Sequence, residues 1–372
     1  MYKVMPVEFG QNEYWEAQLD VSKKFCWLPT DFDVSETGHV SICSYINNLH
    51  PVKHENLYPI IAEIFGKFLP IFEQVVTDVV HPRLKRRVPV DLTKLWTPVR
   101  LELEPVWGDN YSDADTYYEA HDAWRAQNIF NEPQPDSFQS PDRPVQPYSL
   151  SGRRLQAIVK MSNILLTPEN PEYLGGIWHV EAMANERIIA TGIYYYDSEN
   201  ITESNLNFRE KIDKDRGIEY EDEDALSIER LYGVQLDKIE GDAELVQEVG
   251  RVSSNQNRCI VFPNIYEHKV SAFKLKNQSK PGHRKILVFF LVDPATPIPS
   301  TSVVPPQQQE WWNTGSALEK LPIELVENIL GKIEFPISHE DAKKLRLELM
   351  EERKPPANVQ SSFNPVFHMC EH

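Results

Sequence analysis

Cysteine is scarce in this chain of 372 residues and occurs only as Cys26, Cys43, Cys259 and Cys370. These positions form neither a CxxC pair nor a dense framework, so the sequence predicts neither a zinc knuckle nor a disulfide scaffold. We therefore expect a reducing compartment, the cytoplasm.

Long apolar runs are also missing. No stretch of about 18 apolar residues occurs, and such a stretch is what a membrane-spanning helix needs. The first residues, MYKVMPVEFGQNEYWEAQ, contain no apolar segment of signal-peptide length. The sequence predicts a soluble protein with no membrane partner.

Positive charge is in deficit, since 38 Lys and Arg residues stand against 56 Asp and Glu residues for a formal charge of −18. Such a charge opposes contact with phosphate backbones and anionic membrane surfaces, so we expect no nucleic-acid partner. The one basic cluster, Arg83-Leu84-Lys85-Arg86-Arg87, is interpreted as a solvated face or loop.

The N-terminal region, residues 1–150, is predicted to be mainly helical and to pack on the core. Its clearest helix is residues 55–80, where apolar residues recur at helical spacing. Five prolines between Asn131 and Tyr148 predict a connection without regular structure.

Residues 151–296 have a different texture, typical of a β-rich barrel or sandwich. Four β-branched or aromatic runs occur there, LQAIVKMSNILL, ERIIATGIYYYD, NRCIVFPN and HRKILVFFLVDP. An acidic insertion at about 198–250 includes EYEDED at 219–224. Residues 297–372 form a predicted helical extension, with helices in ELVENILGKI and from His339, the latter capped by Ser338. We expect one integrated domain.

The stretch YLGGIWHVEAM, residues 173–183, carries a candidate metal site. His179 and Glu181 follow a Gly-Gly bend and lie two residues apart, so both side chains can point to one face of an extended segment. A second imidazole from His268, at the end of the third β run, would complete a set of two histidines and one carboxylate that suits non-haem Fe(II). The alternative is that both histidines are hydrogen-bonded core or rim residues. A second His-x-acid match, at His339, lies at a predicted helix start and is interpreted as structural.

Arg284 opens the strongly apolar run HRKILVFFLVDP. An arginine that points into a barrel interior needs an anion, because an unpaired buried guanidinium is unfavourable. A small dicarboxylate held by a bidentate contact would supply that anion. The alternative is a surface position at the start of the strand. In YYYD, Tyr195 shares one face with Thr191 and Ile193 while Tyr194 and Tyr196 share the other, and one of these faces should line the pocket.

With these residues in chain order, the region from about 155 to 294 resembles the Fe(II)/2-oxoglutarate-dependent dioxygenases, whose fold is the double-stranded β-helix, the jelly roll of the cupins. RIIATGIYYYD is similar to the strand that follows the HxD motif in prolyl-hydroxylase-type members, which implies a cosubstrate-carboxylate role for Tyr195. LQAIVK resembles the preceding strand and implies that Lys160 and Gln156 lie near the metal-proximal end of the cosubstrate or near the substrate.

Four longer stretches, SYINNLHP, YLGGIWHVEAMANERIIAT, ENITESNLNFR and PGHRKILVFFLVDP, resemble a large, mainly fungal family catalogued only as a domain of unknown function. This similarity spans nearly the whole chain. The resemblance implies an α+β fold with a jelly-roll core, a helical N-terminal region and C-terminal helices.

The dioxygenase resemblance also implies the chemistry. His179, Glu181 and His268 would bind Fe(II), and Arg284 and Tyr195 would hold 2-oxoglutarate. O2 would then drive hydroxylation, desaturation or cyclisation at a C–H bond of a small molecule, with an amino acid or an amino-acid-derived secondary metabolite expected. Alanine in place of either histidine should remove iron with little loss of fold.

Three alternatives stay open: a protein or peptide side-chain hydroxylase, a cupin-like metalloenzyme that does not use 2-oxoglutarate, and a non-enzymatic interaction module. The chain departs from the usual pattern in two ways. Glu181 replaces the commoner Asp, which keeps a coordinating carboxylate and argues against a halogenase. Arg284 lies farther beyond His268 than is usual, so KLKNQSKPG must form a loop, or His283 or another cation takes the carboxylate.

Overall fold

A computed structural model describes residues 21–80, 90–108, 111, 113–134, 146–181, 183–211, 225–232, 243–244, 246–312, 320–330, 336–353 and 366–367. Several segments interpreted from the sequence lie outside these described residues: the basic cluster at 83–87, most of the proline-rich connection (135–145), the acidic run at 219–224, and Cys370. Cys26, Cys43 and Cys259 are described, and all three are free thiols.

The chain divides into two compact units. The first contains residues 1–82, 145–208 and 250–356, and the second contains residues 83–144, 209–249 and 357–372. All three regions predicted from the sequence therefore contribute to the first unit.

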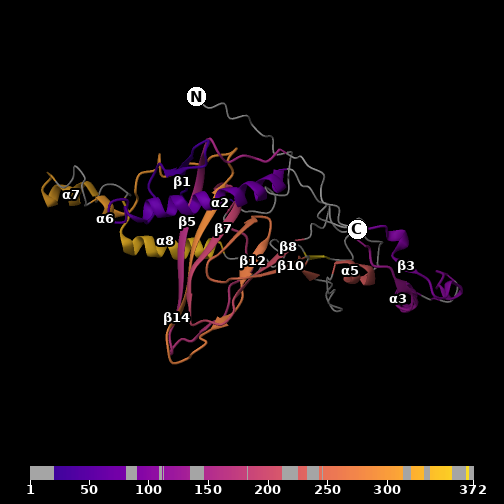
Figure 1. Cartoon of the computed structure of the whole chain (residues 1–372). Coiled ribbons are helices and arrows are strands. Elements are labelled where there is room, and N and C mark those ends of the chain that lie inside the picture. The colour runs from indigo at the N-terminus through magenta and orange to yellow at the C-terminus, as the bar shows by residue number, and fades with distance from the viewer. Residues whose placement is uncertain are drawn as a thin grey trace. The chain divides into compact units, whose positions relative to one another are not determined.

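The centre of the first unit is a six-stranded sheet in the order β11-β7-β14-β5-β1-β2, and neighbouring strands run antiparallel (Figure 1). Its strands are β1 (Thr30–Val34), β2 (Val40–Ile42), β5 (Arg153–Leu166), β7 (Ile188–Glu199), β11 (Arg258–Pro263) and β14 (Gly282–Val292). The four long β runs predicted from the sequence are confirmed as β5, β7, β11 and β14.

Two short strands, β1 and β2, accompany the helices of the N-terminal region. They extend the sheet beyond β5, with Phe32 of β1 opposite Leu155. TDFDV alternates β-branched or aromatic residues with aspartates, as strands do, but it is only five residues long and β2 has only three, so neither segment gives a strong signal alone. Partner strands rather than local propensity hold these segments extended.

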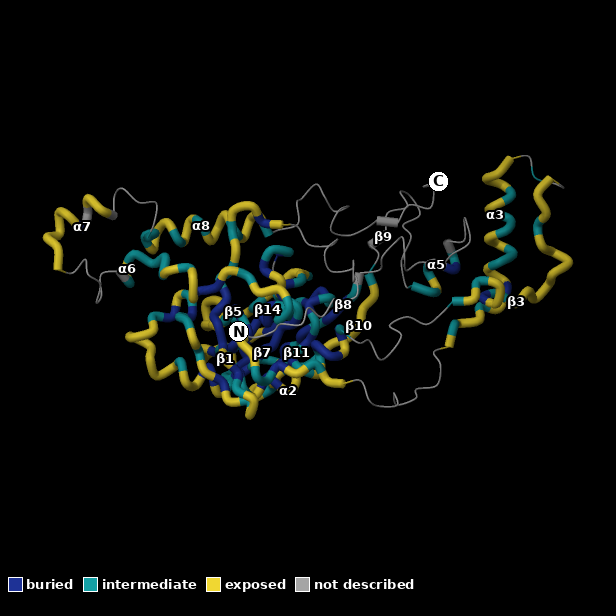
Figure 2. The backbone as a smooth tube through the Cα atoms, turned by 90° about the horizontal axis from the view of Figure 1, so that it is seen from above, coloured by how far each residue is buried: buried dark blue, intermediate teal, exposed yellow. Residues whose placement is uncertain are grey.

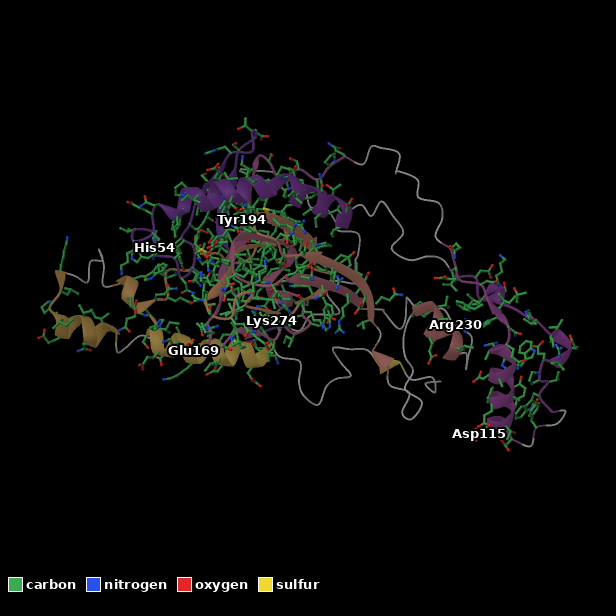
Figure 3. All side chains as sticks on the ribbon, turned by 60° about the horizontal axis from the view of Figure 1, so that its bottom comes forward. His54, Asp115, Glu169, Tyr194, Arg230 and Lys274 are labelled. Carbon is green, nitrogen blue, oxygen red and sulfur yellow. The ribbon has the colours of Figure 1, made fainter. Side chains whose placement is uncertain are left out.

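One face of the six-stranded sheet is covered by α2 (Leu57–Val80), which confirms the helix predicted there. Phe65 and Phe68 of α2 lie with their ring centroids 5.1 and 5.5 Å from that of Phe289 on β14. Tyr194, labelled in Figure 3, packs against the edge of this same core. The alternation on β7 is therefore settled, with Tyr194 and Tyr196 on the α2 side of the sheet.

Gly192 on β7 allows α2 to pack this closely. A Cβ at this position would lie 2.8 Å from Phe68 Cδ1 and 2.8 Å from Phe72 Cζ. We expect Gly192→Ala to lower the free energy of unfolding by about 1–3 kcal/mol, as overpacking of a core typically does. Chemical denaturation measures this change.

Gly66→Ala is the matched control for Gly192→Ala. Its new Cβ would meet Val40 Cγ2 at an ordinary 3.5 Å, and alanine is the better helix former. We expect Gly66→Ala to be neutral or to stabilise by about 0.5–1 kcal/mol. Equal effects of the two variants would contradict the packing assigned to Gly192.

The opposite face of the six-stranded sheet carries a second core. Its inward residues are Ile158, Ile193, Tyr195, Val288 and Phe290, which pack with Leu206 and Phe208 of β8 and Phe262 of β11. A three-stranded sheet in the order β10-β8-β12 supplies the second layer, with β8 Asn205–Lys211, β10 Val246–Ser253 and β12 Glu267–Val270. The adjacent strands β7 and β14 hold most of the buried residues of the sheet, shown in dark blue in Figure 2.

The described elements therefore form a mixed fold of helices and antiparallel sheets. Within the described part of the chain the sheets do not close into a barrel, so the jelly-roll core stays a prediction. Two short strands, β6 (Glu172–Tyr173) and β13 (Phe273–Lys274), pair beside the main sheet, and a 3₁₀ helix, η3 (Ala184–Glu186), precedes β7. Among the described residues, no helix combines the length and the apolar character that crossing a bilayer requires.

Both predicted C-terminal helices are confirmed, as α7 (Ile323–Leu330) and α8 (His339–Glu352), and a short α6 (Gln309–Trp312) precedes them. Ser338 caps α8 as predicted, because its hydroxyl accepts a hydrogen bond from the Asp341 N–H at 3.1 Å. His339, the second His-x-acid match, therefore lies at a helix start.

Arg353, the residue directly after α8, connects this helix to η3, the 3₁₀ helix that precedes β7. Its Nη2 donates to Glu186 Oε1 at 2.5 Å, and its guanidinium lies 4.0 Å from the centroid of the Trp27 ring. Glu186 is fully buried and also accepts hydrogen bonds from the backbone N–H groups of Trp27 and Met183.

Arg353→Ala should lower the free energy of unfolding by about 3 kcal/mol, because it leaves the buried Glu186 carboxylate without its counter-charge. The control is Glu348→Ala on the same helix, which removes an exposed ion pair with Lys24. That variant should stay within about 0.5 kcal/mol of the wild type. Denaturant titrations that give equal effects would contradict the anchoring role of Arg353.

The second unit is built around a small aromatic cluster. β3 (Trp96–Thr97) pairs with β4 (Ile129–Phe130), and α5 (Ala225–Tyr232) packs on them. Trp96 Nε1 donates to the Ser227 hydroxyl at 2.7 Å, and the Arg230 guanidinium, labelled in Figure 3, lies 5.5 Å from the Trp96 ring centroid. The other elements in this part of the chain are η1 (Leu92–Lys94), η2 (Leu101–Leu103), α3 (Ala114–Arg125), β9 (Ala243–Glu244) and β15 (Val366–Phe367).

Candidate metal site

His179 and His268 are brought together by their own backbones. The two residues form an antiparallel bridge, with the His179 N–H donating to His268 O at 3.2 Å and the His268 N–H donating to His179 O at 2.9 Å. Residues directly opposite in such a bridge present their side chains to the same face. Their ring centroids are accordingly 4.5 Å apart.

The Gly-Gly bend explains how the segment carrying His179 reaches β12. Gly175 has a φ of +99°, and a Cβ there would lie 3.1 Å from Val270 O and 3.2 Å from Ala272 N. Gly176 then donates its N–H to Val270 O at 2.9 Å. Glycine supplies both the left-handed conformation and the close approach of two backbones.

Glu181 completes the group, as the sequence predicts. Its Oε1 lies 3.3 Å from His268 Nε2 and 3.8 Å from His179 Nε2. One ligand atom from each of the three side chains lies within 4.8 Å of the other two. Ligands about 2.1 Å from a common ion and at right angles to each other would be about 3 Å apart, so small side-chain adjustments would let these atoms share one ion.

The protonation states also suit a cation. Burial alone would raise the pKa of Glu181, but the hydrogen bond and charge of His268, together with the charges of His179 and Lys160, hold this pKa at about 2. Burial and the neighbouring His268 lower the pKa of His179. The site therefore offers an anionic carboxylate and a neutral imidazole at neutral pH, the forms that bind metal.

Both imidazoles are oriented by the same local contact. His179 Nδ1 lies 2.9 Å from the carbonyl oxygen of Ile177, and His268 Nδ1 lies 3.5 Å from that of Tyr266. A ring nitrogen that faces a carbonyl oxygen carries the hydrogen, which leaves Nε2 as the free ligand atom. The two Nε2 atoms are the ones nearest Glu181.

The two histidines differ in burial. His268 is 3% exposed and its ring lies 4.9 Å from that of Phe262, whereas the His179 side chain is 43% exposed. His268 therefore lies in the packed interior, so alanine there is expected to cost more folding stability than alanine at His179. Core residues therefore close the site on the side of His268, whereas the side of His179 is exposed to solvent.

Arg284 lies in the interior, not at the surface, with 3% of its area exposed. Its Nη1 donates to the Ser204 hydroxyl at 2.9 Å, and its guanidinium lies 5.6 Å from the Tyr195 ring centroid and 5.2 Å from that of Phe273. Its Nε has no hydrogen-bond partner, and no carboxylate of the described residues lies within ion-pair distance of it. Burial lowers the pKa of Arg284.

Tyr195 and Arg284 lie on the same face of the sheet, because Tyr195 stands opposite Ile286, and Ile286 and Arg284 are two residues apart on β14. A β-bulge on β7 adds Ser198 to this face. Lys285 pairs with Asp197 and Ile286 pairs with Tyr195, so Tyr196 is an extra residue on β7. The bulge reverses the alternation of β7 beyond it and sets Ser198 opposite Arg284. The buried Ser198 hydroxyl also has no hydrogen-bond partner in the described structure.

The other predicted residues fall in different places. Lys160 is exposed, with its Nζ 5.9 Å from the Phe290 ring centroid, yet its charge lowers the pKa of both Glu181 and His179, so it lies beside the metal-ligand group. The Gln156 amide is engaged elsewhere, because it donates to Ile298 O and accepts from Ile298 N–H, both at 2.8 Å. These two hydrogen bonds tie Gln156 to the backbone of Ile298. The role of Gln156 beside the cosubstrate stays a prediction.

The alternative cation, His283, is directed away from Arg284. Its Nε2 lies 2.8 Å from Asp197 Oδ2, which also accepts from Lys285 at 2.7 Å. Residues 276–280 form bends and a turn between β13 and β14, so most of KLKNQSKPG is a loop, as predicted.

Sequence reasoning missed three residues that shape the site: Ser204, which accepts a hydrogen bond from Arg284, Tyr173, which raises the pKa of Arg284 electrostatically, and Asn264, which hydrogen-bonds the Glu181 backbone. The one available signal was a polar residue at the end of a β run, VFPN. That pattern is also typical of an ordinary turn.

A family model matches residues 3–315, well over half of the chain. The family is described as "Protein of unknown function (DUF4246)". The curated proteins include no match to this sequence.

Proposed function

The chain belongs to the family described as protein of unknown function (DUF4246), and from its site we propose that it is an Fe(II)- and 2-oxoglutarate-dependent oxygenase. The observation that carries the proposal is the meeting of His179, Glu181 and His268, with one ligand atom from each within 4.8 Å of the others. Two imidazoles and one carboxylate on one side of an ion, with the other positions open, are the donor set of non-haem Fe(II) oxygenases.

Arg284 supports the choice of an anionic cosubstrate. A buried guanidinium without a carboxylate partner in the described structure is unfavourable until an anion binds. A dicarboxylate would accept from Arg284 and from the Ser204 hydroxyl, and the Tyr195 and Phe273 rings would exclude water from this contact. Such exclusion strengthens a charge-assisted hydrogen bond.

The spacing along β14 also supports this assignment. Arg284 and Val288 face the same side of the strand and lie about 13 Å apart at 3.3 Å per residue. Lys160, whose charge reaches Glu181, stands opposite Val288. The long arginine side chain and a short dicarboxylate together can span such a distance.

The bound ion would supply the redox chemistry that couples decarboxylation of 2-oxoglutarate to oxidation of a C–H bond. The residues of the chain hold and orient the reactants. His179, Glu181 and His268 would hold the ion, Arg284 with Tyr195 would hold the distal carboxylate, and the Phe262 and Phe208 rings shield His268 from water. On the resemblance, we propose a small-molecule substrate, an amino acid or a derivative of one, and hydroxylation, desaturation or cyclisation as the outcome.

Stoichiometry tests the proposed reaction class. The purified protein with Fe(II) and 2-oxoglutarate should consume O2 slowly without substrate and form one succinate for each O2. His179→Ala is the control that should form none. Iron-dependent consumption of O2 without succinate would contradict the use of 2-oxoglutarate and favour another cupin-like metalloenzyme.

A further inference from the structure

Asn264 lies between the two segments that carry the metal ligands. It follows β11 and precedes the turn into β12, the strand that contains His268. Its side chain is 3% exposed, and its amide both accepts a hydrogen bond from the Glu181 backbone and donates one to it. Asn264 Oδ1 accepts from the Glu181 N–H at 3.0 Å, and Asn264 Nδ2 donates to Glu181 O at 2.8 Å.

The same amide also reaches β7. Asn264 Nδ2 donates to Ile188 O at 3.1 Å, and the Asn264 N–H donates to Ile189 O at 3.0 Å. One buried side chain therefore satisfies backbone groups at both ends of the loop from Glu181 to Ile188. Loss of this side chain would take away the partners that it gives to the buried Glu181 N–H and C=O, which is unfavourable for each group.

The three ligands are thus linked by two backbone connections. The bridge between His179 and His268 fixes the two imidazoles relative to each other. This bridge does not fix Glu181, which follows His179 by two residues in a segment without regular structure. The Asn264 amide supplies the missing connection, because it ties Glu181 to the segment that leads into His268.

We propose that Asn264 is a positioning residue that holds the Glu181 backbone so that its carboxylate meets both imidazoles at one ion. This inference rests on the proposed metal site. An asparagine suits the role because one amide offers an acceptor and two donors in a plane, which matches a neighbouring N–H and C=O. Outer-shell partners of this kind typically contribute about 10–100-fold to metal affinity.

The test is the affinity of the full chain for Co(II), measured by isothermal titration calorimetry together with the melting temperature. Asn264→Ala removes all three side-chain hydrogen bonds. Asn264→Asp has the same shape and leaves no cavity, but it lacks the NH2 group that donates to Glu181 O and Ile188 O. We expect both variants to bind Co(II) about 10–100-fold more weakly than the wild type.

The control is Val76→Ala on α2, a buried residue on the other face of the sheet. It should lower the melting temperature without changing the affinity for Co(II), which separates positioning from general destabilisation. The inference is overturned if both Asn264 variants bind Co(II) as the wild type does. It is also overturned if neither variant folds, since Asn264 would then be a requirement of the whole fold. Failure of the wild type itself to bind Co(II) would overturn the metal site, and would be recognised as a separate result.

Discussion

Replacing His179 with alanine will abolish tight binding of divalent metal and leave the fold nearly intact. The His179 side chain is 43% exposed, and its bridge to His268 uses backbone groups that alanine keeps. We therefore expect the free energy of unfolding to change by less than about 1 kcal/mol. Loss of one of three ligands should weaken Co(II) or Mn(II) binding by more than about 100-fold, beyond what loss of an outer-shell partner causes.

Calorimetry and circular dichroism on the same samples measure the two effects of His179→Ala. His268→Ala is a less clean test, because this ring is 3% exposed and packs on Phe262, so its removal leaves a cavity. His268→Gln fills more of that space and is the better second variant. Metal affinity that survives in His179→Ala would favour the alternative in which the histidines only support the fold.

Arg284→Met will remove 2-oxoglutarate binding and keep metal binding. The buried Arg284 guanidinium lies 5.6 Å from the Tyr195 ring centroid, and methionine offers a similar length without charge. We expect at least a 100-fold loss of affinity for 2-oxoglutarate, measured by calorimetry with Mn(II) present, and an unchanged affinity for Mn(II). Loss of about 3 kcal/mol, typical for a partner of a buried charge pair, corresponds to about this factor.

The same variant should be as stable as the wild type, or more stable, when no cosubstrate is present. Replacing a buried charge that has no counter-charge with an apolar side chain removes a desolvation penalty. Lys285→Met on the same strand is the matched control: it makes the same change of charge on the other face, where Lys285 pairs with Asp197. Equal affinity for 2-oxoglutarate in the wild type and in Arg284→Met would contradict the role of Arg284.

The strands that position the site could be predicted from the sequence because their residues leave little choice. β5, β7, β11 and β14 are rich in β-branched and aromatic residues and are bounded by Gly, Pro or Asn. β1 and β2 were harder to predict, because TDFDV and VSI have the composition of strands but are only five and three residues long and depend on pairing, β1 with β5 and β2 with β1.

The meeting of His179, Glu181 and His268 could be predicted from residue types and spacing, but their environment could not. The bulge at Tyr196 depends on the register between two strands, which is decided by packing on both faces of the sheet. The role of Asn264 depends on a contact between segments far apart in the sequence. A polar residue after a β run is compatible with any turn, so the sequence contains no sign of this contact.

The most direct test of the account is anaerobic spectroscopy of the Fe(II) protein before and after addition of 2-oxoglutarate. A 2-oxo acid that chelates Fe(II) produces a visible charge-transfer band. We expect this band in the wild type, its absence in His179→Ala, and its appearance in Arg284→Met only at much higher concentrations of 2-oxoglutarate. A wild-type protein that shows no such band at saturating Fe(II) and 2-oxoglutarate would contradict the proposal that His179, Glu181 and His268 form an iron site for this cosubstrate.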